Sequence, residues 1–557
     1  MDKAFIIKGG GKKNGKEKIG KQVTACVCAL IMAFGVAACG SSAGTAEPDV
    51  SGGQGKTINS GAAADSGRKD TWLADEMVTI TYARPESSLQ PYNPDCATVE
   101  WIRENLGINL QVSTYSDYET KMNTLLAANQ LPDLFTIWGN VSDVVGTGCL
   151  MELSDLINQY APNIQKDYEN IPELSRYKMD GGIYTLAQIR RDDNWEQGSV
   201  PCIRTDLLKE QGLAVPKTWE ELYDVLEELS KAYPDSIAYG TRGDDRLLFN
   251  YMSPIKGLGG DYGLYQDEDN VWHMGLLEDS YRDALQYIHR MYQSGILDNE
   301  YLIVSADDWK SGLGTGKYLF YYDNPVFLDT LNKTLRETNP DAKLEPIMFL
   351  ENEEGKTVNY GHPNNYYNVW GISADTENKE VLMKFVDWLY SEQGGYLMNY
   401  GIEGTHWEMV DQKPQFLDSV VEEYKSRTGD PTYEAGSEIG IGDLFLDMSW
   451  YSNYDAAFKS TSEESWTREN IHKVYVNNMD CVIQQPIEPP YTAEESARIT
   501  EINQSYMDYS KTEINKFISG ERSFEDWDAF VQELISKGAQ ERVDIANQAE
   551  QRFAKGE

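Results

Sequence analysis

The chain has 557 residues, and 90 acidic against 49 basic side chains give it a formal net charge of −41. That length allows more than one domain and a large buried core, and 41% hydrophobic residues predict that most of the chain folds. Nucleic-acid binding requires a basic surface, which so acidic a chain lacks, and no nucleic-acid partner is expected. For the same reason, charge attraction cannot hold the chain to an anionic membrane.

The first 38 residues differ from the rest in charge. They hold seven Lys against Asp2 and Glu17, and an uncharged apolar run follows at residues 23–38. That run is shorter than the ~20 residues that a membrane-spanning helix needs. A basic start, a short apolar stretch and small residues at its end are typical of an export signal. We therefore expect residues 1–38 to be a signal peptide.

The end of this run resembles a bacterial lipobox, in which an aliphatic residue and two small residues precede a Cys. Here the residues are Val36-Ala37-Ala38-Cys39. The resemblance implies that the Cys39 thiol receives a lipid and becomes the first residue after cleavage. It places the protein at the cell membrane on the extracellular face, attached only through the lipid. Residues 40–71 are rich in Gly, Ser and Ala and predict a flexible tether, which leaves residues 72–557 as the folded body.

Four further cysteines, Cys96, Cys149, Cys202 and Cys481, are widely scattered. This scatter favours buried free thiols over two disulfides. No Cys-x-x-Cys or His-Glu-x-x-His motif occurs, so neither a metal nor a cofactor is expected. The acidic residues 267–270 could ligate calcium, but Val271 and Trp272 break the spacing of an EF-hand loop. A solvated acidic turn is the favoured interpretation.

From residue 76 onward, short β-branched runs alternate with amphipathic segments. The predicted strands are residues 77–82, 133–138, 183–189, 317–322 and 367–372. Predicted helices begin at Thr218, at Ser280 and at Ser523, and each carries an apolar face at helical spacing. Alternating elements of these lengths predict an α/β protein, and no fixed repeat is evident.

Several segments resemble the extracellular solute-binding proteins of bacterial ABC importers, and in particular the large lipoproteins that take up oligosaccharides. The segments, spread over residues 75–555, are LLAANQLPDLF at 125–135, ELSDLINQYAP at 152–162, DGGIYTL at 180–186, IRTDLL at 203–208 with PKTW at 216–219, YGIEGTHW at 400–407 and KFISGE at 516–521. Their order and spacing carry the resemblance more than any single piece.

This resemblance implies a two-lobed periplasmic-binding-protein-like fold, with a multi-segment hinge and a ligand cleft between the lobes. We expect the first lobe at about residues 76–195 and 320–370, and the second at about 196–319 and 371–557. The implied function is to capture a carbohydrate, in particular an oligosaccharide, and to deliver it to membrane permease subunits. A monomer that is not an enzyme is expected.

Sugar sites combine aromatic faces with a few polar side chains, so candidate ligand-binding residues lie at strand ends and in loops. The aromatic candidates are Tyr82, Trp138, Trp195, Tyr322, Trp370, Trp407 and Trp450, and the polar ones are Asn140, Arg190, Asp192, Asp323 and Glu403. Trp219 and Trp527 lie on apolar helix faces and are assigned to the core. We expect Ala at Trp138, Trp370 or Trp407 to weaken binding with little loss of fold.

Two alternatives stay open at this point. One is a surface-anchored glycoside-degrading enzyme, since its two carboxylates cannot be identified among 90 acidic residues. The other is a binding protein for peptides or other non-sugar solutes, since a fold does not fix a ligand. Arg190 and Arg191 could grip the carboxylate of an acidic sugar. The strongly negative chain nevertheless favours a neutral or weakly charged oligosaccharide.

Overall fold

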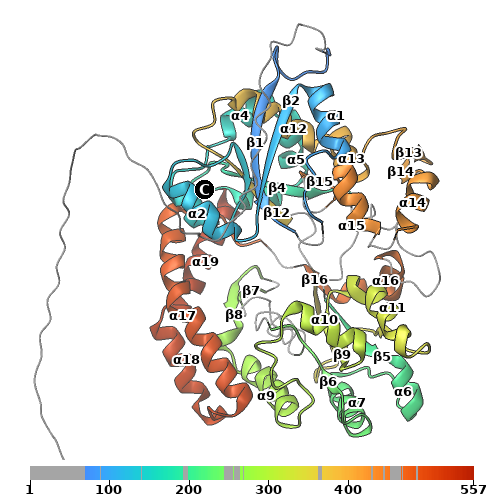
Figure 1. Ribbon diagram of the computed structural model, residues 1–557. Coiled ribbons are helices and arrows are strands. Elements are labelled where there is room, and N and C mark those ends of the chain that lie inside the picture. The colour runs from blue at the N-terminus through green and yellow to red at the C-terminus, as the bar shows by residue number, and fades with distance from the viewer. Residues whose placement is uncertain are drawn as a thin grey trace, which may run out of the picture. The chain divides into compact units, whose positions relative to one another are not determined.

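The computed structural model describes residues 69–87, 90–138, 141–191, 199–243, 255, 264–267, 269–361, 367–427, 431–442, 446–451, 466, 468–484 and 487–556. The predicted signal peptide, Cys39 and nearly all of the predicted tether lie outside these residues. Within them, two main β-sheets are covered by helices (Figure 1).

The first sheet has six strands in the order β15-β4-β12-β3-β1-β2. The strands are β1 (Val78–Pro85), β2 (Ile108–Tyr115), β3 (Leu134–Thr136), β4 (Thr185–Arg190), β12 (Tyr367–Ile372) and β15 (Ser449–Trp450). β12 runs antiparallel to its neighbours β3 and β4, and the other pairs are parallel. The strands β1, β2, β3, β4 and β15 therefore run in the same direction, and their carboxyl ends lie at one edge of the sheet.

Helices bury the apolar faces of this sheet. They are α1 (Ala97–Leu106), α2 (Tyr118–Ala127), α3 (Val141–Gly146), α4 (Ser154–Tyr160), α5 (Pro162–Asn170), α12 (Lys379–Tyr390) and α13 (Glu392–Tyr400). The resulting first core joins β-strand residues such as Ile80 and Leu186 to Leu389 of α12. α1 ends at Gly107, where φ is 68° and a Cβ would lie 2.6 Å from the Trp72 ring. Glycine is therefore required at this turn.

The second sheet has four strands in the order β10-β5-β9-β6. They are β5 (Val200–Arg204), β6 (Ile237–Tyr239), β9 (Tyr318–Asp323) and β10 (Leu344–Pro346). Its helices are α6 (Thr205–Gln211), α7 (Trp219–Ala232), α9 (Asp279–Gln293), α10 (Ala306–Thr315) and α11 (Leu328–Thr338). Thr218 caps α7 as predicted, because its hydroxyl accepts from the Glu221 N–H; the Glu221 carboxylate in turn accepts from the N–H of Lys217.

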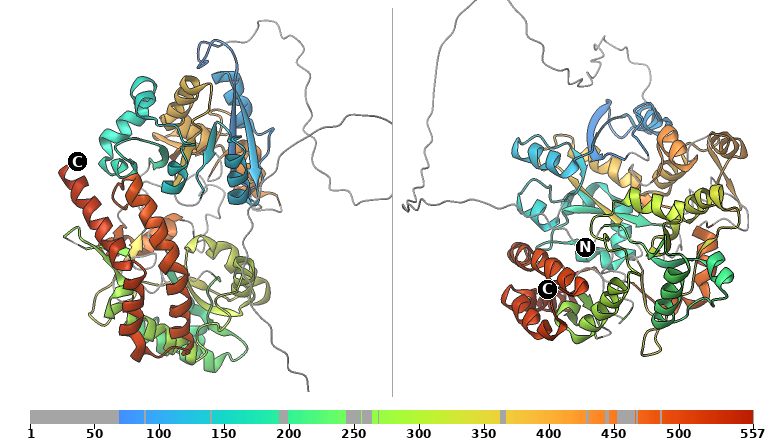
Figure 2. Two further views of the ribbon diagram at one scale, coloured as in Figure 1. Left: turned by 90° about the vertical axis from the view of Figure 1, so that its left-hand side faces the viewer. Right: turned by 60° about the horizontal axis from the view of Figure 1, so that its bottom comes forward.

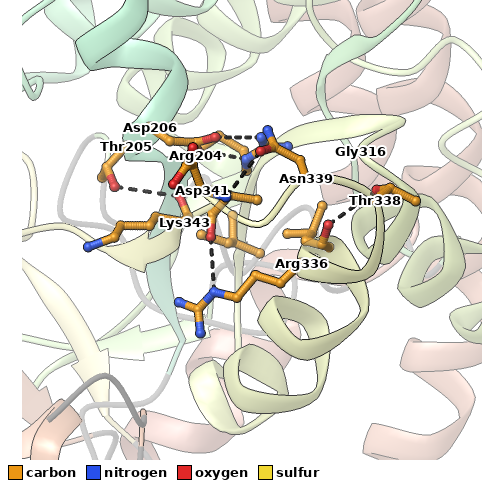
Figure 3. A network of polar contacts seen from close by, with 12 residues as sticks. Arg204, Thr205, Asp206, Gly316, Arg336, Thr338, Asn339, Asp341 and Lys343 are labelled. Carbon is orange, nitrogen blue, oxygen red and sulfur yellow. Dashed lines mark hydrogen bonds and ion pairs between the residues drawn. The ribbon is translucent and has the colours of Figure 1, made fainter.

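A polar network fixes the end of β5 to the turn between α11 and β10 (Figure 3). Arg204 binds Asp206 through two hydrogen bonds of 2.8 and 2.6 Å. The backbone N–H of Thr205 donates to the Lys343 carbonyl, and Arg336 donates to the carbonyl of Ala342. These contacts hold β5 beside β10 at the edge of the second sheet.

Three C-terminal helices lie side by side and pack on the second sheet's helices (Figures 1 and 2). They are α17 (Ala493–Ser519), α18 (Trp527–Ser536) and α19 (Ala539–Lys555). Phe517, Trp527 and Phe530 from these helices join Leu285 of α9 and Phe320 of β9 in the second core. The prediction that Trp527 belongs to the core is confirmed.

α19 also contacts a segment of the first core. Arg176, in the 3-10 helix η1 (Pro172–Tyr177), binds the Glu550 carboxylate through bonds of 2.8 and 2.7 Å. Their side chains are only 14% and 10% exposed. The Trp272 indole also donates to Glu550, at 3.0 Å. Leu174 of η1 is in the first core, so Glu550 ties the first core to the hairpin that carries Trp272.

The remaining elements are short. They are the hairpins β7 (Leu264–Gln266) with β8 (Trp272–Met274) and β13 (Trp407–Val410) with β14 (Lys413–Phe416), the parallel pair β11 (Asn359–Gly361) and β16 (Val482–Gln484), the helices α14 (Asp418–Lys425), α15 (Pro431–Ala435) and α16 (Arg468–Tyr475), the 3-10 turns η3 (Gly275–Leu277), η4 (Pro325–Phe327), η7 (Val476–Cys481) and η8 (Phe524–Asp526), and the π-helical turn η5 (Gly436–Gly440).

The sheet pairings differ from the expected lobe boundaries. The boundary expected at about residue 320 falls inside β9, and the whole strand pairs with β5 and β6 in the second sheet. β12 does pair in the first sheet, and α12 and α13, expected in the second lobe, pack in the first core with it. The chain thus passes between the sheets after β4, after β10 and after β15. Repeated crossings of this kind make the multi-segment hinge of a two-lobed fold.

All four cysteines of the body are free, as predicted. Cys96 and Cys202 are buried, while Cys149 and Cys481 are half-buried. Burial raises the pKa of the Cys202 thiol well above its usual value, and Cys96 is shifted in the same direction for the same reason. These two thiols therefore behave as small core side chains.

Candidate ligand-binding site

Ligands of α/β proteins bind beyond the carboxyl ends of the strands, so the two strand-end edges are the places to look for a site. In the first sheet, Trp450 of β15 lies opposite Arg190 of β4 in the strand register. The guanidinium carbon of Arg190 stands 4.3 Å from the centre of the Trp450 ring, and both side chains are buried. Two predicted site residues therefore meet in a cation–π contact at this edge.

The neighbouring Arg191 has a different role from Arg190. It binds both Asp167 carboxylate oxygens, at 2.5 and 2.7 Å, and donates to the Tyr390 carbonyl and the Ser449 hydroxyl. These contacts clamp β4 to α5 and α12. Of the two adjacent arginines, Arg191 is thus committed to the first lobe's packing.

Tyr82 and Trp370 pack together inside the first sheet. The Trp370 indole donates to the Tyr82 hydroxyl at 3.3 Å, and that hydroxyl lies 3.4 Å from the Thr136 hydroxyl. Both rings are almost fully buried, and burial raises the pKa of the Tyr82 phenol. Trp138, two residues beyond β3, is also buried and donates to the Asn123 side chain at 2.9 Å.

Arg84, which the sequence analysis did not select, lies at the end of β1. It is buried, its Nη1 donates to the Pro85 carbonyl, and its Nε has no hydrogen-bond partner within the described part of the chain. Burial lowers the pKa of this guanidinium, against the pull of Tyr82, Tyr92 and Asp447. Its position directly after an apolar strand is the signal that could have identified it.

In the second sheet, the predicted residues Tyr322 and Asp323 end β9. Asp323 accepts from Nε and Nη2 of Arg242 at 2.7 and 2.8 Å, and it is only 2% exposed. The Tyr322 hydroxyl donates to the Asn359 side chain at 2.6 Å. Arg242 follows β6, which is parallel to β9, so both ends lie at the same edge. Sequence reasoning missed Arg242, because nothing local links two residues 81 positions apart.

Trp407 and Glu403 are not at the strand ends of either main sheet, and Trp407 packs in a separate small core. Trp407 is buried in a small core with Tyr400 and Phe416, and its indole donates to the Gly401 carbonyl at 2.8 Å. Glu403 is exposed. Together with Trp101 they line a hollow of about 490 Å³ beside α13. Asn140, Asp192 and Trp195 lie outside the described residues.

Of the acidic stretch at 267–270, the described residues Asp267, Asp269 and Asn270 lie between β7 and β8. The Asp267 carboxylate accepts from the N–H groups of Val271 and Asp269 and lies 2.7 Å from His273 Nε2. The hydrogen bond from Val271, followed by the contact with His273, lowers the pKa of Asp267. The carboxylate thus stabilises the turn. Among the described residues, no group of three or more His, Cys, Asp or Glu is placed to hold a metal ion.

The described helices include none that is both long and apolar enough to cross a membrane. Two helix-covered sheets joined by repeated crossings define the two-lobed binding-protein fold. The crystal structure of the alginate-binding protein AlgQ2 without calcium ion matches it with a TM-score of 0.70, at 21% identity over 87% of this chain and 100% of that one. The crystal structure of S. pneumoniae FusA in complex with kestose gives a TM-score of 0.65 at 19% identity, over 86% of this chain and 100% of that one.

The chain belongs to the bacterial extracellular solute-binding protein family, whose model matches residues 100–396, more than half of its length. It is 24% identical to the polygalacturonan/rhamnogalacturonan-binding protein YtcQ of Bacillus subtilis (strain 168), over 92% of this chain and 96% of YtcQ. It is 23% identical to the fructooligosaccharide substrate-binding protein FusA of Streptococcus pneumoniae serotype 4, over 85% and 90%. The family consists of binding proteins, so the chain is not an enzyme.

Proposed function

We propose that this protein is the membrane-anchored, extracellular substrate-binding component of an ABC importer for oligosaccharides. The observation that carries the ligand class is the match of nearly the whole chain to YtcQ, together with that to FusA, since both are named for polymeric or oligomeric sugars. Aromatic and charged side chains at the strand ends of both sheets support it, because sugar sites combine the same two kinds of group.

The proposed site is built from Arg190, Trp450 and Trp138 on the first sheet and from Tyr322 and Asp323 on the second. Arg84 and Arg242 are added to the predicted set, since they lie at the same strand ends. Tyr82 and Trp370 support the first edge from beneath. Roles for Asn140, Asp192, Trp195, Glu403 and Trp407 stay predictions. Hinge motion between two such lobes can enclose a ligand and present the closed form to permease subunits.

The two named relatives point to ligands of different charge. Galacturonan carries a carboxylate on each sugar unit, whereas fructooligosaccharides carry none, so the two relatives differ in the charge of what they are named for. Arg191 and Arg242 are each bound by a carboxylate, which reduces the positive charge offered to an acidic ligand. We therefore keep a neutral or weakly charged oligosaccharide as the favoured ligand.

A thermal-shift screen of the purified protein against neutral and acidic oligosaccharides tests this function. A bound sugar raises the melting temperature because it stabilises only the native state. Recovery of the sugar unchanged after long incubation is expected and would exclude the glycoside-degrading alternative. A screen in which peptides shift the melting temperature and no saccharide does so would contradict the proposed ligand class.

The lipid anchor and a monomeric body are part of the same proposal. Cys39→Ser removes the thiol that the lipid requires, so the protein is expected to leave the membrane fraction with its melting temperature unchanged. Several acyl chains hold a protein firmly, at ~0.8 kcal/mol for each buried CH₂. Retention of the Cys39→Ser protein in washed membranes would contradict anchoring at this residue.

A further inference from the structure

The second lobe holds a cavity of about 660 Å³ that belongs to neither strand-end edge. It lies between the start of α7, the middle of α9 and the loop after β10, and its walls include Trp219, Asp283, Tyr287 and Glu351. Its volume falls in the range of about 300–1,000 Å³ that is usual for small-molecule sites.

Trp219 connects this cavity to the proposed site. Its ring is stacked on Tyr322 with centroids 5.8 Å apart, and Tyr287 meets it edge-on at 6.0 Å. The Tyr287 hydroxyl also donates to the Trp219 carbonyl, which fixes the start of α7 against α9. Trp219 packs in the core, as its place on an apolar helix face predicts, and it also lines the cavity.

The indole N–H of Trp219 is a buried donor without a partner. Trp219 is only 7% exposed, and its Nε1 has no hydrogen-bond acceptor among the residues that the structure describes. A buried donor without an acceptor costs free energy. This nitrogen is too buried for a ligand in the cavity to reach, so the polar groups offered to a ligand are those of the other wall residues.

The charges around the cavity select the kind of ligand. Its walls carry the carboxylates of Glu220, Asp283, Glu351 and Glu353. The cation among the lining residues, Arg290, is bound to Glu220 at 2.7 and 2.6 Å and packs over Tyr223 at 4.2 Å. An acidic group would meet like charge here. A sugar hydroxyl can donate to a carboxylate, and each sugar unit carries several hydroxyls.

We propose that this cavity is a subsite for uncharged sugar units of the bound saccharide. The proposal rests on the oligosaccharide-binding function above and adds where part of the ligand sits and that this part carries no charge. The Trp219–Tyr322 stack then joins the subsite to the strand ends of the second sheet.

Fluorine NMR of the full chain labelled with 5-fluorotryptophan tests the subsite. Trp219→Phe assigns the Trp219 resonance, and Trp527→Phe assigns a core Trp as the matched control. Fructooligosaccharides of increasing length serve as the neutral probe and oligogalacturonides as the acidic one, with binding heats measured in parallel. A neutral saccharide is expected to shift the Trp219 resonance and to leave that of Trp527 in place.

A second variant pair does not depend on replacing a buried ring. Glu351 and Glu354 are both exposed and lie in the same loop, but Glu354 is not part of the cavity wall. Glu351→Gln is expected to weaken neutral-saccharide binding about tenfold, the loss typical of one hydrogen bond to a charged group, and Glu354→Gln to leave it unchanged.

Binding heat that leaves the Trp219 resonance unmoved, with Glu351→Gln like wild type, would overturn the subsite while the proposed function stands. A Trp219 shift with oligogalacturonides alone would overturn the assignment of an uncharged ligand. If neither series gives heat or a shift, the proposed function fails for these sugars and the subsite fails with it.

Discussion

The strand-end edges of the two sheets use arginine in opposite ways. On the first sheet Arg190 lies over the ring of Trp450, whereas on the second sheet Arg242 is clamped by the carboxylate of Asp323. The second edge is therefore held by an ion pair with two hydrogen bonds, and the first edge by a contact between a cation and an aromatic face.

The largest expected effect comes from breaking the second edge. Arg242→Ala leaves the Asp323 carboxylate buried without its counter-ion, which is expected to lower the free energy of unfolding by about 3–5 kcal/mol. Urea denaturation measures this. The control is Arg290→Ala, because the Arg290–Glu220 pair is 45% and 51% exposed and should contribute less than about 1 kcal/mol. If both variants lose the same free energy of unfolding, the buried pair is no more important for stability than the exposed one and the prediction is wrong.

A second buried arginine–carboxylate pair, Arg176–Glu550, connects the C-terminal helix α19 to the first core. Burial would raise the pKa of Glu550, but hydrogen bonds from Arg176 and Trp272 outweigh it and hold the pKa below 4.5. Because the pKa is lower in the folded chain, the stabilisation is complete above about pH 4.5 and is lost as the pH falls through the folded value. Glu550→Gln should lower stability at pH 7 by about 2 kcal/mol.

Urea titrations of wild type and Glu550→Gln between pH 3 and pH 7 measure this effect. The stabilities of the two proteins are expected to converge as the medium becomes more acidic. Glu541→Gln is the control, since Glu541 lies on the same helix as Glu550 and its ion pair with Arg498 of α17 is exposed. A constant difference at every pH would show that Glu550 does not act through its charge.

On the first edge, Arg190→Gln keeps a polar side chain but removes the cation. We expect oligosaccharide affinity to fall about tenfold, about 1.4 kcal/mol, with a stability loss of similar or smaller size. Arg191→Gln should lower stability more than it lowers affinity. Arg191 binds Asp167 and donates to two further groups that pack the first lobe. Calorimetry at two salt concentrations distinguishes a neutral from an acidic ligand. A wild-type affinity that falls steeply with salt, with no such fall in the Arg190 variant, would favour an acidic ligand.

The smallest expected effect concerns the neutral contacts beneath the first edge. Tyr82→Phe removes the hydroxyl that accepts from the Trp370 indole and keeps the ring. Thermal unfolding should show a loss of about 1 kcal/mol, and saccharide affinity should stay close to wild type. A large loss of binding in this variant would mean that the hydroxyl touches the ligand.

Local patterns predicted the elements well and their assignment to sheets less well. The predicted strand at 367–372 coincides with β12, and Thr218 begins α7 as expected, because β-branched runs and caps are local signals. The lobe boundary expected at about residue 320 divided β9, whereas the whole strand pairs in the second sheet. Strand pairing depends on contacts far apart in sequence, and β9 pairs with β5 more than a hundred residues earlier.

The sequence predicted several of the residues that lie at the candidate site but not which side chains contact one another there. Choosing residues at strand ends found Arg190, Trp450 and Asp323, yet their partners came only from the structure. Trp138, Trp370 and Trp407 were expected to tolerate Ala, but all three are buried and hydrogen-bonded. Replacing a buried Trp by Ala typically costs about 3–5 kcal/mol, so such variants report on stability as much as on binding.

The position of Glu550 near the end of the chain bears on the order of assembly. Its partner Arg176 is made 374 residues earlier, and the second core is closed by Phe517, Trp527 and Phe530. During synthesis, the first strands emerge long before the helix that fastens them to the rest of the molecule. Contacts that span such a separation form late, because a long loop must close first. A chain shortened before α19 would lack the Arg176–Glu550 ion pair but would keep the packing of α17 on α3, so we expect it to be cleaved by proteases faster than the full chain.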